Sequence, residues 1–156
     1  MNLQDYSTNI TVDKTVEETF KAINNICGWW STEFEGSAGK QDDVFTVRFG
    51  DTFITMKVIE LIPYSKIVWK VVDSWKHWMK SNNTEWIGTS LIFEIAEGED
   101  KTSVQFTHVG LVPVLDCFEV CTDAWSGYIT NSLRNLINTG KGQPTQKENT
   151  TVASGN

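Results

Sequence analysis

Apolar and polar positions alternate with a period of two along much of the first two thirds of the chain. The alternation is clear over residues 44–58, 67–72, 89–95 and 104–108, and an earlier run, Tyr6 to Val12, is rich in β-forming residues. Such alternation between turn residues is typical of strands that bury one face. Short turns between consecutive runs favour a meander of antiparallel strands.

Two short helices are expected after the first strand. Thr15 and Glu18 have the spacing of a capping box, which predicts a helix start at Val16. Residues 26–34, which contain the pair Trp29-Trp30, are interpreted as a second short helix or turn that directs aromatic rings inward.

The period changes to that of a helix near the end of the chain. Residues 107–113 lead out of the last strand through Gly110 and Pro113, and about 26 residues of helical pattern follow. A helix of that length spans about 39 Å, the width of a small domain. Its expected inward stripe is Leu115, Phe118, Thr122, Trp125, Ile129, Leu133 and Leu136.

These elements predict an α+β fold: a curved antiparallel sheet wrapped around one long C-terminal helix, with two short helices after strand one. A sheet that grips a helix in this way is expected to leave a cavity between them. Residues 1–142 are predicted to form this single domain, and the polar, aperiodic residues 143–156 a disordered tail.

Composition narrows the range of partners. The formal net charge of −7 argues against nucleic-acid binding through phosphate contacts and against an anionic membrane surface. No apolar run approaches the ~20 residues of a membrane span. Three cysteines and an N-terminus without a secretory signal predict reduced thiols in the cytoplasm.

Several motifs together resemble a known family. They are Trp29-Trp30, Trp86 with Gly88-Thr89, residues 107–111, and the ending at residues 136–144. They resemble the activator-of-heat-shock-protein-90-ATPase-like branch of the START-like superfamily (SRPBCC). The resemblance implies a helix-grip fold with an apolar cavity. It leaves the function open, because the superfamily includes lipid carriers, cyclases, hormone receptors and cochaperone domains.

His108 is the most suggestive polar residue. It shares strand parity with Val104 and Phe106, so it is expected to point at the long helix or into the cavity. An imidazole there suits ligand recognition or proton transfer. A core histidine bonded to the helix or backbone is the interpretation we favour, because acid–base work needs a second group within reach and none is identified. No catalytic residue is therefore assigned.

The cysteines and histidines do not form a recognised disulfide or metal-binding motif. Cys117 and Cys121 stand one helical turn apart and are poor disulfide partners, so small apolar packing is the favoured role. With His77 and His108 the only histidines, no zinc spacing is recognised, and no metal or cofactor is expected.

The leading hypothesis is a domain that binds a small hydrophobic molecule between sheet and helix. Two alternatives stay open: a cochaperone-type interaction module with a chaperone as partner, and a cyclase-type enzyme that uses His108. Ligand identity and oligomeric state are not encoded in any recognised feature. The residues predicted to line the cavity are Trp30, Met56, Trp69, Phe106, His108, Phe118, Cys121 and Trp125.

Overall fold

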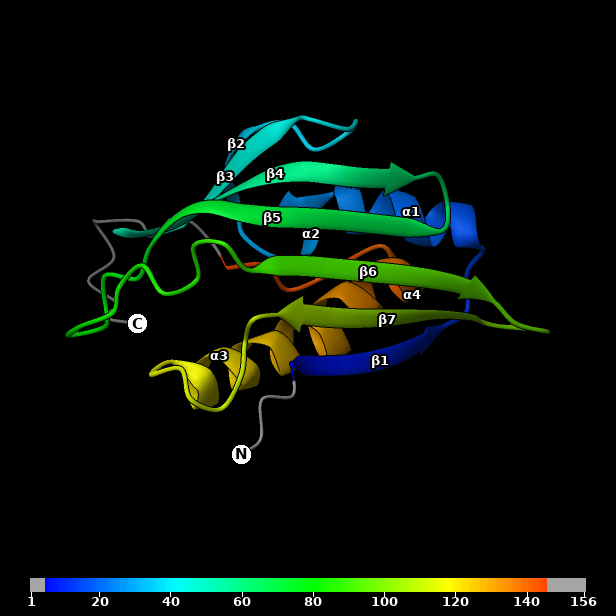
Figure 1. Cartoon of the computed structure of the whole chain (residues 1–156). Helices are drawn as coiled ribbons and strands as arrows, with labels where there is room; N and C mark the ends of the chain where they lie inside the picture. Colours follow the sequence, from blue (N-terminus) through cyan, green and yellow to red (C-terminus); the bar gives the residue numbers. More distant parts are fainter. Residues whose placement is uncertain (1–4, 146–156) are drawn as a thin grey trace, which may run out of the picture.

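A computed structural model describes residues 5–145 of the chain. Seven strands form one antiparallel sheet in the order β1-β7-β6-β5-β4-β3-β2, and the sheet curves around the C-terminal helix (Figure 1). The predicted helix-grip α+β fold is confirmed. The strands are β1 (Tyr6–Val12), β2 (Glu33–Gly36), β3 (Val44–Phe49), β4 (Thr52–Ile62), β5 (Lys66–Trp75), β6 (Ser90–Glu97) and β7 (Thr102–Val109).

Strands β3 to β7 follow one another as the predicted meander, and β2 adds one more strand beside β3. Strand β1 lies at the far edge beside β7, and Ile10 pairs with Val104 there. Helices α1 (Val16–Asn24) and α2 (Ile26–Trp29) carry the chain from β1 across to β2 at the opposite edge. Thr15 caps α1 as expected: its hydroxyl accepts from the Glu18 N–H, and the Glu18 carboxylate accepts from the Thr15 N–H, both at 3.1 Å.

Strand β2 corrects the sequence analysis, which interpreted residues 26–34 as a helix or turn. Only Ile26–Trp29 is helical, and Glu33–Gly36 pairs with β3 as an edge strand. The segment has a single large apolar residue, Phe34, between two glutamates. One apolar position is too few to show a period, and charged residues are common on exposed edges.

The C-terminal helix also differs in detail from the prediction. It runs from α3 (Phe118–Trp125) through a wider π-helical segment, η1 (Ser126–Leu133), into α4 (Arg134–Thr139), and residues 113–117 are turns. The helix is therefore shorter than predicted, and its buried stripe shares Trp125, Ile129 and Leu133 with the predicted one. The buried apolar positions recur every four residues: Cys117, Cys121, Trp125, Ile129, Leu133 and Ile137.

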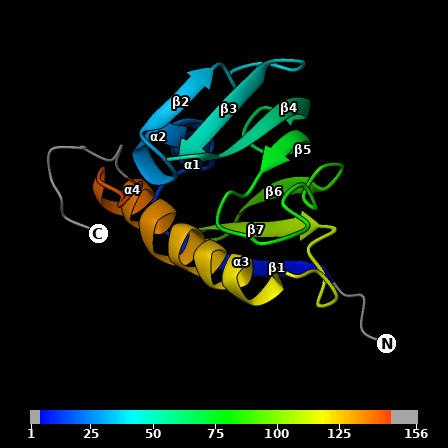
Figure 2. The same cartoon turned by 90° about the vertical axis from the view of Figure 1, so that its left-hand side faces the viewer.

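The π-helical segment explains why this stripe stays straight. In an α-helix a four-residue repeat drifts around the axis, whereas the wider i→i+5 turns of a π-helix turn less per residue and reverse the drift. Leu115, Phe118, Thr122 and Leu136, which were expected on the inward stripe, are only half-buried. Figure 2 shows the helix crossing the open side of the curved sheet.

Only the start of the predicted tail lies within the described residues. Gln143 donates its N–H to the Ser132 hydroxyl at 2.7 Å, and that hydroxyl donates to the Trp29 carbonyl at 2.7 Å. Thr145 donates its N–H to the Trp30 carbonyl at 2.9 Å. Gln143 and Thr145, both after the predicted boundary at 142, are thus hydrogen-bonded to the domain, and residues 146–156 lie outside the described part.

Gly110, at the start of the turn from β7 to the helix, provides a test of the fold. Its φ is +103°, and a Cβ there would lie 2.6 Å from the Thr89 Cγ2 atom. Because both the backbone conformation and the contact disfavour a side chain, we expect Gly110→Ala to lower the free energy of unfolding by about 2–4 kcal/mol. Chemical denaturation followed by tryptophan fluorescence measures this.

Gly127 is the matched control, because it lies within the helix and a Cβ there would meet no atom within 4 Å. We expect Gly127→Ala to be neutral or stabilising by up to about 1 kcal/mol. Equal effects of the two substitutions would contradict the conformational role of Gly110.

Candidate functional site

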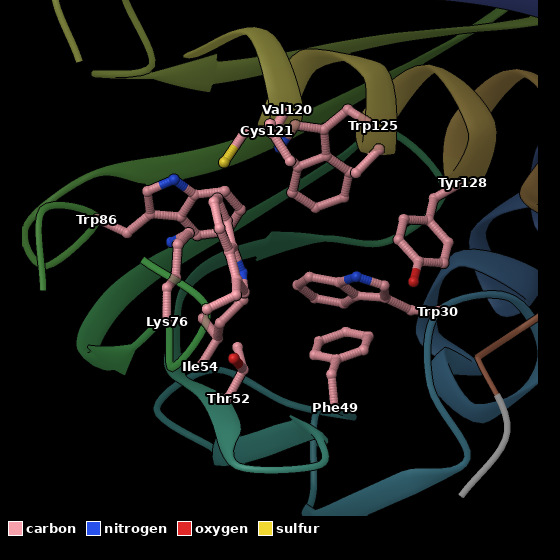
Figure 3. Close-up of a pocket in the computed structure, with 12 residues that line it drawn as sticks. Trp30, Phe49, Thr52, Ile54, Lys76, Trp86, Val120, Cys121, Trp125 and Tyr128 are labelled. Carbon is pink, nitrogen blue, oxygen red and sulfur yellow. The ribbon is translucent and has the colours of Figure 1, made fainter. Parts of the chain in front are cut away.

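A pocket of about 200 Å³ opens between the helix and the sheet, where the start of β4 and the segment after β5 face α3 (Figure 3). Aromatic and aliphatic side chains form most of its wall. The helix contributes one side, the sheet another, and the loop between β5 and β6 closes one end. The lining residues are Trp30, Phe49, Thr52, Ile54, Lys76, Trp78, Trp86, Val120, Cys121, Ala124, Trp125 and Tyr128.

The rings of the wall pack against one another. The Trp30 and Trp125 centroids are 5.1 Å apart, and Trp125 stacks on Trp86 at 5.9 Å with nearly parallel planes. Behind the wall, Trp125 contacts Phe106 of β7 at 4.7 Å, as expected from the strand parity. The lining rings of Trp30, Trp86 and Trp125 are almost fully buried, so the pocket wall is also part of the hydrophobic core.

His108 holds this wall in place. The Trp125 indole N–H donates to His108 Nδ1 at 3.0 Å, so Nδ1 carries no proton. The proton is therefore on Nε2, which donates to the Thr89 hydroxyl at 2.8 Å, and Thr89 in turn donates to the Trp86 carbonyl at 2.7 Å. Burial, with the nearby Lys76 charge, lowers the pKa of His108 to about 3. The imidazole is neutral, and both of its nitrogens are bound within the protein.

The eight residues predicted to line the cavity are not all in this pocket. Trp30, Cys121 and Trp125 line it. Phe118 is half-buried on α3 and packs against the core. The other four are fully buried in the core behind the lining: Met56, Trp69, Phe106 and His108.

The sequence analysis did not predict the other nine lining residues, and Lys76 is the one among them that carries a charge. Its side chain is only 3% exposed, and its Nζ lies 3.4 Å from the centroid of the Trp86 ring. Within the described part of the chain, this Nζ has no hydrogen-bond partner. Burial lowers the pKa of Lys76 to about 8, although the thiols of Cys121 and Cys117 and the Glu85 carboxylate act in the opposite direction.

The alternation of inward and outward residues along β5 could have predicted that Lys76 points inward. Ser74 in β5 is fully buried and Trp75 is exposed, so residue 76 continues on the inward side. The polar, irregular character of residues 75–84 hid this continuation. Trp78, from the same segment, is half-exposed at the rim of the pocket.

Two thiols lie beside the ammonium. Cys117 is fully buried, accepts from the Trp86 indole N–H at 3.3 Å, and donates its backbone N–H to Glu85 at 2.9 Å. A hydrogen bond between the two thiols raises the pKa of Cys117 and lowers that of Cys121, and the Lys76 charge further lowers the pKa of Cys121. This neighbourhood joins residues 76 and 121, which no local sequence pattern connects.

The described residues contain no cluster of three or more His, Cys, Asp or Glu side chains placed to hold a metal ion. Across residues 5–145, no helix combines the length and the apolar character needed to cross a lipid bilayer.

Comparison with solved structures places the fold. The chain is similar to the Aha1 dimer from Colwellia psychrerythraea, with a TM-score of 0.73 and 24% identity over 90% of this chain and 100% of that one. It is similar to DynU16, a protein of the dynemicin biosynthetic locus, with a TM-score of 0.67 and 14% identity over 92% of this chain. The chain spans 51% of the length of DynU16.

A third similar structure is SSP2350 from Staphylococcus saprophyticus, with a TM-score of 0.62 and 17% identity over 90% of this chain and 96% of that one. No protein-family model matches the sequence, and no curated protein matches it. The fold is the helix-grip fold that the resemblance of the sequence motifs implied, and it is shared with these solved structures. At these identities the similarity establishes the fold alone.

Removing the buried charge of Lys76 tests the electrostatics of the site. The folded-state pKa of about 8 lies below the unfolded value of 10.5. Protonation therefore favours the unfolded state, and the full cost of the charge is present below pH 8. We expect Lys76→Met to raise the free energy of unfolding at pH 7 by about 1–3 kcal/mol, with the Trp86 contact reducing the gain.

Because the cost disappears when the lysine is neutral in both states, this gain should shrink as the pH rises from 8 to 10.5. Denaturant titrations at pH 7 and pH 10 measure it. Lys70→Met is the control, because Lys70 is exposed on β5 and its replacement should change stability little at either pH. A large loss of stability in Lys76→Met at pH 7 would contradict the assignment.

Proposed function

We propose that this chain binds a small hydrophobic molecule in the pocket between the sheet and α3. The observation that carries the proposal is an open pocket whose wall is aromatic and already held in position. Pockets of mainly apolar lining with few polar groups are typical small-molecule sites. A wall fixed by hydrogen bonds before binding reduces the entropy lost on association.

Hydrogen bonds hold the indole rings of Trp86 and Trp125 in position, so the pocket wall is preorganised for a ligand. Trp125 is held by His108, and Trp86 is held through its indole by Cys117 and through its carbonyl by Thr89. A flat apolar molecule can contact both rings without rearranging either. We also propose a cytoplasmic location, which the three free thiols of Cys27, Cys117 and Cys121 support.

A second candidate function is an interaction module that binds a chaperone. The similarity to the Aha1 dimer from Colwellia psychrerythraea over 90% of this chain favours it. Pull-down with the purified bacterial heat-shock ATPase, together with its rate of ATP hydrolysis, separates the two candidates. A ligand-binding domain without this role is not retained by the ATPase and does not change its rate of ATP hydrolysis. The cyclase-type alternative is not carried forward, because both nitrogens of His108 are already bound.

Filling the pocket provides the direct test of ligand binding. Ala124 is an exposed helix residue in the pocket wall, so a large side chain there extends into the opening without disturbing the core. We expect the wild-type protein to gain melting temperature with members of a library of aromatic acids, amides and lipids, and Ala124→Trp to lose this gain. Differential scanning fluorimetry and mass spectrometry of extracted protein provide the measurements.

Ala96→Trp is the matched control, since Ala96 is exposed on β6 and is not among the lining residues. This variant should respond like the wild type. If no compound shifts the wild-type melting temperature and nothing is extracted, or if Ala124→Trp responds like Ala96→Trp, the proposed pocket function is wrong.

A further inference from the structure

The pocket contains one charge that nothing in the described structure neutralises at hydrogen-bond distance. Lys76 Nζ makes no hydrogen bond and forms none of the ion pairs found among residues 5–145. A buried ammonium normally has an anionic or hydrogen-bonding partner, because leaving water costs several kcal/mol. The Trp86 ring, 3.4 Å away, offers a π face but accepts no conventional hydrogen bond.

The charge is at one end of an otherwise apolar space. In Figure 3, Lys76 and Trp86 lie at one end of the pocket, and Trp30, Phe49 and Tyr128 lie at the other. Cys121 and Trp125 cover both from the helix. An occupant that fits this arrangement has a polar group at the Lys76 end and a flat apolar body beside Trp30.

We propose that the pocket binds an apolar, preferably aromatic, molecule that carries one carboxylate, and that the Lys76 ammonium is the counter-ion of that carboxylate. This inference rests on the proposed ligand-binding function and specifies its ligand class. A carboxylate supplies the missing acceptor and neutralises the charge, and such charge-assisted hydrogen bonds are about twice as strong as neutral ones. A neutral ligand would leave the ammonium without its counter-ion.

The other ionisable groups around Lys76 do not take this role. The Glu85 carboxylate already accepts the backbone N–H groups of Asp116 at 3.3 Å and Cys117 at 2.9 Å. His108 is neutral and fully bonded. The thiols of Cys117 and Cys121 approach from the helix, and Cys121, whose pKa is lowered, is the one group that could compete for the ammonium.

Matched acid and amide probes test the inference on the full chain. Benzoate with benzamide and 2-naphthoate with 2-naphthamide differ in charge but little in shape, and two sizes allow for the pocket volume. We expect calorimetry at pH 7 to show the better-fitting acid binding about 10- to 100-fold more tightly than its amide. Lys76→Met should remove this preference and leave the affinity for the amide unchanged or higher.

The pH dependence assigns the effect to Lys76. Because the pKa of this lysine is lowered to about 8, the wild-type affinity for the acid should fall by up to about tenfold per pH unit above 8, while that for the amide stays constant. Lys76→Arg should keep the preference for the acid and show no such fall, because a guanidinium stays charged. A fall that persists in Lys76→Arg and is absent in Cys121→Ala would assign the titration to the thiol and overturn the inference.

The two proposals fail in different ways. If the acids and amides bind equally, or if Lys76→Met keeps the preference for the acid, the role of Lys76 is wrong while the ligand-binding function stands. If no acid or amide binds and the library also gives no response, the ligand-binding function itself is wrong.

Discussion

The hydrogen bond from the Trp125 indole to His108 is the interaction on which the helix, the sheet and the pocket all depend. It joins the middle of the long helix to the inner face of β7 at a position from which water is excluded. Buried donors and acceptors are costly when unpaired, so this bond fixes the rotation of the helix more sharply than apolar packing alone. The relay through Thr89 extends the same constraint to Trp86.

A fixed rotation of the helix has a consequence for the pocket. Because buried positions repeat every four residues, Cys121 and Trp125 face the sheet together, and Val120 and Ala124 fall at the rim beside them. The side chains of Val120 and Ala124 are smaller than the neighbouring Trp125 ring. Because a hydrogen bond holds that ring in place, it cannot move to fill the space beside them, and a pocket stays open. The buried stripe that includes Cys121 and Trp125 therefore both packs against the sheet and forms part of the pocket wall. A bound ligand would pack against this stripe as a core side chain does.

Strand alternation was the strongest signal that the sequence contained. It placed β1, β3 and the inward orientation of His108 correctly, and the capping box placed the start of α1. Those features depend on neighbours within a few residues. Strand β2 was missed because four residues with one large apolar side chain show no period. The π-helical segment was missed because a 3.6-residue period was imposed on positions that repeat every four.

The pocket chemistry was harder to predict for a physical reason. Lys76 is significant because Trp86 lies below its charge and Cys121 lies beside it, and these residues come from a loop and a helix far along the chain. A lysine after a strand is ordinarily solvated, and only the tertiary fold removes its water.

A buried charge without a nearby partner is a stability cost that the fold retains. Apolar packing at residue 76 would stabilise the domain, as replacements of buried charges often do, so the lysine does not stabilise this fold. The pocket offers it one open direction, toward a space whose other walls are hydrocarbon and aromatic rings. A cation kept in such a place lowers the free energy of the domain only when an anion enters. That difference between the empty and the occupied pocket is the physical basis of the proposed preference for acids.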